Sequence, residues 1–186
     1  MKRVELEHIL RACKGTTDET EFIVIGSQSI LGKVPDAPRV LRESMEADVY
    51  PKFRPDLSPY LAGNLGEMSL FHQTRGIWVD GVATTTATLP SGWDERLVKV
   101  ENENTGGAIG WCLDPHDLAY SKLAARREKD IAFVANLLRH KLVKPSRVEA
   151  LIEALIASAT DAALRERLAE AWAICRARAA EDGGAA

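Results

Sequence analysis

Stretches of apolar residues, either unbroken or alternating with polar ones, occur at five places in the chain and predict β-strands. They cover residues 22–25, 46–50, 77–82, 97–101 and 108–113. In the second stretch, the strand period of two places Glu46 and Asp48 on one face and Ala47 and Val49 on the other. We therefore expect a sheet that carries a pair of carboxylates on one face of its second strand.

Apolar residues at helical spacing predict helices at both ends of the chain. The first helix covers Leu6 to Gly15, and a second begins at Pro115, for which Asp114 is a suitable N-cap. Two more helices are expected after Pro145 and from about Asp161, where the pattern becomes purely helical.

These elements together predict an α+β fold, in which a mixed sheet is flanked by helices and followed by a C-terminal helical appendage. We expect a sheet domain at residues 1–143, a helical region at 144–180 and a disordered tail at 181–186.

The composition is that of an ordinary globular protein, with 46% hydrophobic and 27% charged residues among 186. A net charge of −3 argues against broad nonspecific nucleic-acid binding, although it allows a local basic patch. Cys13, Cys112 and Cys175 are isolated, which favours reduced thiols. Since the sequence has neither a signal pattern nor a run of eighteen apolar residues, we expect a cytoplasmic protein without a membrane anchor.

The apolar run that ends in Gly26 and Ser27 is the first half of a candidate phosphate-and-metal site. Glycine allows the close backbone approach that a phosphate needs, and Ser27 offers a hydroxyl donor. Eighteen residues separate Ser27 from Glu46, which leaves room for a helix and a loop before the chain returns as a neighbouring strand. Paired carboxylates such as Glu46 and Asp48 suit a divalent cation. Alone, each half also fits a simple turn or a solvated edge strand.

A basic segment on the helix that begins at Pro115 is the second candidate. Lys122, Arg126 and Lys129 stand at i, i+4 and i+7, so one straight helix would aim all three at a triphosphate. Asp130 would point elsewhere on such a helix, and a break near Arg127 is needed to turn it inward. The alternative is a solvated basic face.

These residues resemble the nucleotidyltransferase superfamily related to DNA polymerase beta. The resemblance covers about residues 20–140. Within the superfamily, the chain is similar to an uncharacterised nucleotidyltransferase group that shares the phrases GSQxILG, SMEADxYP, LPxGWxxRL, GWCLxxHDLAxSK and REKD. In that superfamily the Gly-Ser turn holds the nucleotide phosphates and an acidic pair on the next strand binds metal ions. The resemblance therefore implies nucleotide binding at Gly26 and Ser27 and a Mg²⁺ or Mn²⁺ ion at Glu46 and Asp48, with Glu46 replacing the more usual Asp.

The long spacing between the two halves and the segment 113–131 resemble the AbiEii-like toxin branch. That resemblance implies catalytic roles for Lys122 and Asp130, and Arg126 and Lys129 are the further candidates for binding the nucleotide. Many members of the superfamily use a third metal-binding carboxylate, for which we favour Glu101, with Asp80 as the alternative.

The resemblance implies Mg²⁺-dependent transfer of a nucleoside monophosphate from a nucleoside triphosphate to an acceptor hydroxyl. The acceptor would be an RNA end, such as that of a tRNA, or a protein, and the setting a toxin–antitoxin pair with a cognate antitoxin protein. The alternative function keeps the fold without catalysis, as a binding module in a toxin–antitoxin or regulatory pair.

Overall fold

The computed structural model describes residues 1–155 and 162–181, which form two compact units. The first unit comprises residues 1–87 and 94–114, and the second comprises 88–93 and the described part of 115–186. The boundary at residue 114 lies earlier than the expected one at 143, because the helices on both sides of residue 143 pack within the same unit. Of the predicted tail, residues 181–186, Glu181 ends a helix. Residues 182–186 lie outside the described residues.

The first unit contains a five-stranded mixed sheet, which confirms the predicted α+β class. Its strands are β1 (Glu21–Ile25), β2 (Glu46–Pro51), β3 (Trp78–Gly81), β4 (Val98–Val100) and β5 (Ile109–Cys112). The order across the sheet is β3-β2-β1-β5-β4. β1 pairs with β2 antiparallel and with β5 parallel, while β3 runs parallel to β2 and β4 antiparallel to β5. All five strands lie within the predicted stretches or extend them by one residue.

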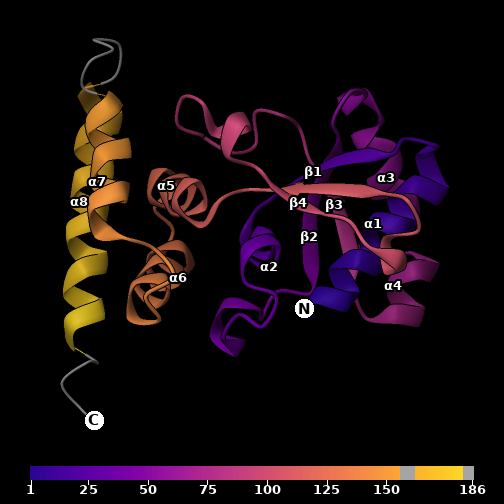
Figure 1. Ribbon diagram of the computed structural model, residues 1–186, viewed down its shortest axis with the longest axis horizontal. Helices are drawn as coiled ribbons and strands as arrows, with labels where there is room; N and C mark the ends of the chain where they lie inside the picture. Colours follow the sequence, from indigo (N-terminus) through magenta and orange to yellow (C-terminus); the bar gives the residue numbers. More distant parts are fainter. Residues whose placement is uncertain (156–161, 182–186) are drawn as a thin grey trace. The chain divides into compact units, whose positions relative to one another are not determined.

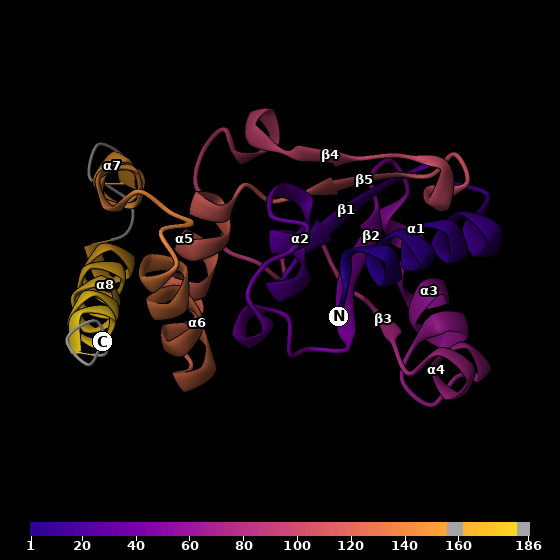
Figure 2. The ribbon, with the colours of Figure 1, turned by 60° about the horizontal axis from the view of Figure 1, so that its bottom comes forward.

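Four α-helices accompany this sheet within the described part of the first unit. They are α1 (Arg3–Thr17), α2 (Ile30–Lys33), α3 (Ser58–Leu65) and α4 (Leu70–Arg75). Five short 3-10 turns also occur, at 27–29, 39–41, 55–57, 93–96 and 103–105. Figure 2 shows α1 and α2 on the same side of β5.

Glycines on the sheet allow the helices to approach one face closely. A Cβ on Gly110 of β5 would stand 2.6 Å from Leu10 Cδ1 of α1, and one on Gly81 of β3 would stand 1.9 Å from the carbonyl oxygen of Ser58. Gly110 pairs with Phe22 in the register, so Phe22 shares this face. We call it the helix-covered face. By strand alternation, Ile23 and Ile25 belong to the opposite face.

From residue 115 on, the described part of the second unit is helical and includes α5 (Pro115–Ala125), α6 (Glu128–Arg139), α7 (Pro145–Ala154) and α8 (Ala162–Glu181). Figures 1 and 2 show α5 beside α6, and α6 packs against α8. Trp172 of α8 donates from Nε1 to Glu149 of α7 at 3.1 Å, which ties the two C-terminal helices together. The predicted helix start at Pro115 is confirmed, and the helix expected after Pro145 begins at Pro145 itself.

All three cysteines are buried and free of disulfides. Burial raises the pKa of the Cys112 thiol to about 12, so the thiol stays protonated at neutral pH. Across the described residues, no helix combines the length and the apolar character needed to cross a bilayer.

Candidate functional site

The turn after β1 is shaped around the carboxylate of Asp48. Gly26 has a φ of +66°, a backbone conformation in which L side chains are strained. A Cβ on Gly26 would stand 1.8 Å from Asp48 Oδ2, because Asp48 pairs with Ile25 across the antiparallel ladder. The amide and the hydroxyl of Ser29 both donate to the Gly26 carbonyl, at 3.2 and 2.8 Å, and close the turn. The sequence motif and the acidic strand therefore meet at this point.

Gln28 lies in the same turn with its side chain buried at 1% exposure. Neither its Nε2 nor its Oε1 atom has a hydrogen-bond partner. Leaving a buried amide unsatisfied costs about 1–3 kcal/mol. Such a group beside a candidate site needs an explanation, and a bound polar ligand supplies one. Sequence reasoning missed Gln28, although its position directly after Gly26 and Ser27 was a usable signal.

Three carboxylates share the face of the sheet opposite the helix-covered face. Alternation along β2 puts Glu46 and Asp48 on one face, as predicted, and Asp48 shares that face with its register partner Ile25. The parallel register of β3 places Trp78 beside Glu46 and Asp80 beside Asp48. We call Glu46, Asp48 and Asp80 the carboxylate trio. Neighbouring strands lie about 4.8 Å apart, so the Asp48 and Asp80 side chains are within reach of a shared cation.

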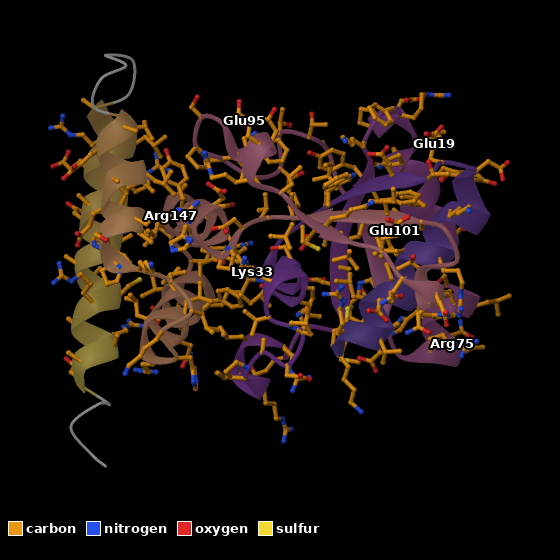
Figure 3. The ribbon with its side chains drawn as sticks, in the orientation of Figure 1. Glu19, Lys33, Arg75, Glu95, Glu101 and Arg147 are labelled. Carbon is orange, nitrogen blue, oxygen red and sulfur yellow. The ribbon has the colours of Figure 1, made fainter. Side chains whose placement is uncertain are left out.

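The sheet order separates Glu101, the residue favoured as the third carboxylate, from the pair on β2. Glu101 follows β4, which stands at the edge of the sheet opposite β3 and three strands from β2, or about 14 Å away. It also lies near the start of β1, whereas Asp48 pairs with the end of that strand. Its carboxylate pairs with Lys99 at 2.5 Å. In Figure 3, Glu101 is well separated from Lys33, which ends the helix that follows the Gly26 turn.

The donor set of the carboxylate trio suits a hard divalent cation, because Mg²⁺ and Mn²⁺ prefer carboxylate oxygens. One of these carboxylates, that of Asp48, occupies the space over Gly26 that a Cβ would fill. Among the described residues, no three His, Cys, Asp or Glu side chains converge closely enough to hold a metal. The trio thus shares a face, and a bound cation would have to draw its side chains together.

Lys122 and Asp130 come together within the second unit. Asp130 is 1% exposed, and Lys122 Nζ lies 3.2 Å from its Oδ1 and 5.4 Å from the ring centre of Phe133. Arg127 Nε donates to Asp130 Oδ2 at 2.6 Å. Burial alone would raise the pKa of Asp130, but the hydrogen bond from Arg127 and the charge of Lys122 outweigh it and hold the pKa below its usual value. The carboxylate is therefore ionised and fixes the lysine.

The predicted break near Arg127 is confirmed, and it ends the proposed basic stripe. α5 ends at Ala125, Arg126 has a φ of +55°, and α6 begins at Glu128. The break turns Asp130 toward Lys122, as expected. It also separates Lys129 from the helix of Lys122, so the single stripe of Lys122, Arg126 and Lys129 is wrong. Arg126 instead pairs with Glu170 of α8 at 2.8 Å, and Lys129 is exposed.

No curated protein and no solved structure matches the chain. The family described as "Nucleotidyltransferase of unknown function (DUF6036)" matches residues 3–178, which covers the sheet, the carboxylate trio and the helical unit. The chain therefore belongs to this nucleotidyltransferase family.

Proposed function

We propose that the protein transfers a nucleoside monophosphate from a nucleoside triphosphate to an acceptor hydroxyl, in a reaction that requires Mg²⁺ or Mn²⁺. The observation that carries this proposal is the position of Asp48 directly against the Gly26 turn. It joins a carboxylate pair to a turn of the kind that holds phosphates, and both belong to a chain of a nucleotidyltransferase family.

Each residue of the turn has a separate task in this proposal. Gly26 leaves the space that the Asp48 carboxylate fills. Ser27, which is half-buried, donates its hydroxyl to a phosphate oxygen, and the Gln28 amide finds in the nucleotide the partner that it lacks. These contacts would orient the triphosphate relative to the acceptor hydroxyl.

The carboxylate trio would hold the divalent cation. A bound cation would neutralise charge on the phosphates and favour ionisation of the acceptor hydroxyl. Glu46 stands where the superfamily more often has Asp, and its longer side chain can span the distance from the first residue of β2 to a cation beside Asp48. Asp80 replaces Glu101 as the third member because it is the register neighbour of Asp48.

For Lys122 and Asp130, the roles implied by the resemblance stay predictions. Lys122 would neutralise charge on the departing pyrophosphate, and Asp130 would position its ammonium group. The short distances from Asp130 to Lys122 and Arg127 support the positioning role. The nucleotide-binding roles of Arg126 and Lys129 lose their support, because these residues do not share a helix face with Lys122.

The acceptor follows from the AbiEii-like resemblance. That branch favours an RNA end, such as a tRNA acceptor stem, over a protein hydroxyl, and it adds a cognate antitoxin protein as the partner that would restrain the activity.

Incubating the full chain with Mg²⁺, α-labelled nucleoside triphosphates and total RNA or protein tests the proposal. We expect label on RNA with the wild type and Glu101→Gln, and a loss of transfer with Asp80→Asn. Glu101→Gln is the matched control, since it removes one carboxylate from the same sheet at the opposite edge. Nucleotide binding without transfer to any acceptor would identify the non-catalytic binding module instead.

A further inference from the structure

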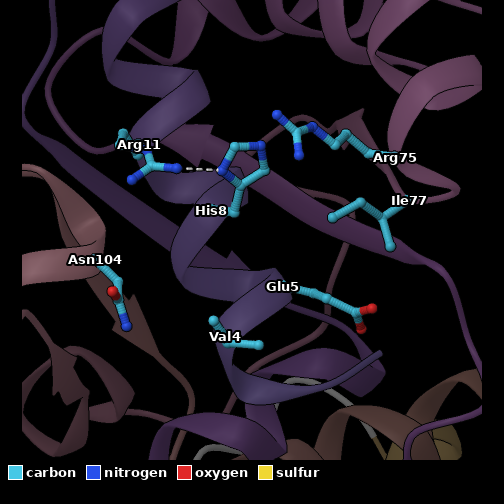
Figure 4. Close-up of a pocket in the computed structure, with 7 residues that line it drawn as sticks. All are labelled: Val4, Glu5, His8, Arg11, Arg75, Ile77 and Asn104. Carbon is cyan, nitrogen blue, oxygen red and sulfur yellow. Dashed lines mark hydrogen bonds between the residues drawn. The ribbon is translucent and has the colours of Figure 1, made fainter.

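A pocket with polar side chains lies in the first unit beside α1. It has a volume of about 350 Å³ and is lined by Val4, Glu5, His8, Arg11, Arg75, Ile77 and Asn104. Figure 4 shows the guanidinium groups of Arg11 and Arg75 extending toward His8 from two sides. The pocket adjoins α1, which packs on the helix-covered face, and it contains none of the carboxylate trio.

Two of the polar side chains are held in place before any ligand arrives. The stem of Arg11 lies against Gly106, where a Cβ would stand 3.0 Å from its Cδ, and its guanidinium contacts His8 Nδ1 at 2.6 Å. The His8 ring stacks on Phe71, with centroids 5.6 Å apart and an interplanar angle of 15°. Holding the groups in this way reduces the entropy lost when a ligand binds.

The protonation state of His8 follows from its neighbours. A guanidinium is always charged and can only donate, so Nδ1 of His8 accepts from Arg11 and Nε2 carries the ring proton. Burial, together with the charges of Arg11 and Arg75, lowers the pKa of His8. The neutral ring therefore offers one N–H donor between two cations.

The charge of this pocket is not balanced by its own carboxylate. Glu5 accepts a hydrogen bond from the backbone amide of Lys2, and Figure 4 shows its carboxylate pointing away from the arginines. The guanidinium of Arg75 makes no hydrogen bond or ion pair with the parts of the chain that the structure describes, 1–155 and 162–181. Two guanidiniums that converge without a counter-ion suit an oxyanion, which both can bind through paired N–H donors.

We propose that this pocket binds a small organic anion by its phosphate or carboxylate group. Arg11 and His8 form the fixed part of the oxyanion site, and Arg75 closes on it from the end of α4. Val4 and Ile77 supply an apolar wall for the body of the ligand. A pocket of this volume lies within the usual range for small-molecule sites.

Titration calorimetry on the full chain tests this proposal with phenyl phosphate, inorganic phosphate and benzoate as probes. We expect saturable binding of phenyl phosphate or benzoate, and weaker binding of inorganic phosphate because it lacks an apolar body. Phenyl phosphate alone would identify a phosphate site and benzoate alone a carboxylate site. Binding of neither, or inorganic phosphate binding as tightly as the better organic probe, would overturn the proposal.

Variants then locate the binding. Arg11→Gln and Arg75→Gln should each weaken the affinity about 10-fold or more, since each removes charge-assisted hydrogen bonds. Arg147→Gln is the matched control, because Arg147 is an exposed arginine of α7 outside the pocket. An equal loss with Arg147→Gln would mean nonspecific attraction and would contradict the assignment. Asp48→Asn should leave the affinity unchanged, and a loss there would place the binding at the carboxylate trio instead.

Discussion

The Oδ2 atom of Asp48 lies 1.8 Å from the point where a Cβ on Gly26 would stand. The two residues are far apart in the chain, and the antiparallel pairing of β1 with β2 brings them together. The absence of a side chain at Gly26 is thus a condition for the position of the carboxylate. This relationship connects the fold to the proposed chemistry.

Replacing Gly26 with alanine should disturb both the backbone and the carboxylate. A residue with a Cβ at this positive φ costs about 1–3 kcal/mol of unfolding free energy, and the Cβ also displaces Asp48. We expect Gly26→Ala to be less stable in chemical denaturation and inactive in transfer. Gly15→Ala is the control, because the helical Gly15 has open space around its Cα and alanine there should stabilise by about 0.5–1 kcal/mol. Equal stability of Gly26→Ala and wild type would show that the turn tolerates a side chain.

Gln28→Met separates a structural role from a ligand-binding role for the buried amide. Methionine has a similar length and no polar atoms, so it removes two unsatisfied groups. We expect the unfolding free energy to stay equal or rise by up to about 1–3 kcal/mol, while the affinity for the nucleotide falls. Denaturation curves and nucleotide titrations measure the two effects. A clear loss of stability would mean that the Gln28 amide is satisfied within the fold.

Asp130→Asn should be strongly destabilising. The change leaves Lys122 with a buried charge that has lost its counter-ion, and breaking a buried ion pair in this way costs about 3–5 kcal/mol. Asp56→Asn is the control, since the Asp56–Arg54 pair is exposed and should contribute little. Chemical denaturation compares the two variants, and similar stabilities would argue against a fixed Lys122–Asp130 pair.

The same carboxylate should contribute to the pH dependence of stability. The pKa of Asp130 is lower in the folded state than in the unfolded state, so the unfolded state takes up the proton first as the pH falls. Its stabilisation is complete above the unfolded pKa of about 3.9 and is lost as the pH falls below it. Denaturation at a series of pH values should show a steeper loss in acid for wild type than for Asp130→Asn. Parallel curves would contradict the assignment.

The sequence predicted the strands and the facing of Glu46 and Asp48, because both follow from local periodicity. It could not rank Asp80 above Glu101, since both residues alternate correctly within their own strands. The choice depends on strand order, which places β3 beside β2 and β4 at the other edge. That order arises from how the helices cross over the sheet, and single-strand patterns do not contain this information.

In the helical unit, too, local sequence spacing could not predict how the side chains are arranged. The spacing of Lys122, Arg126 and Lys129 holds for a straight helix, whereas Arg126 adopts a positive φ and ends the helix beforehand. The need for a break was predictable, because Asp130 could not otherwise face Lys122. The break lies at Arg126, one residue before the expected Arg127. This position depends on packing against α8, where Arg126 pairs with Glu170. The compact units divide at residue 114 and not at 143, because the helix break near 143 is not a gap in packing.

The most direct test of the account is the initial rate of label transfer from a nucleoside triphosphate by Asp48→Asn, with wild type and Asp56→Asn measured in parallel. Asparagine keeps the size of the side chain over Gly26 and removes the charge that would hold the cation. We expect a rate at least about 100-fold below wild type, with Asp56→Asn unchanged. A rate for Asp48→Asn within about twofold of wild type would contradict a reaction centred on the Gly26 turn and the carboxylate trio.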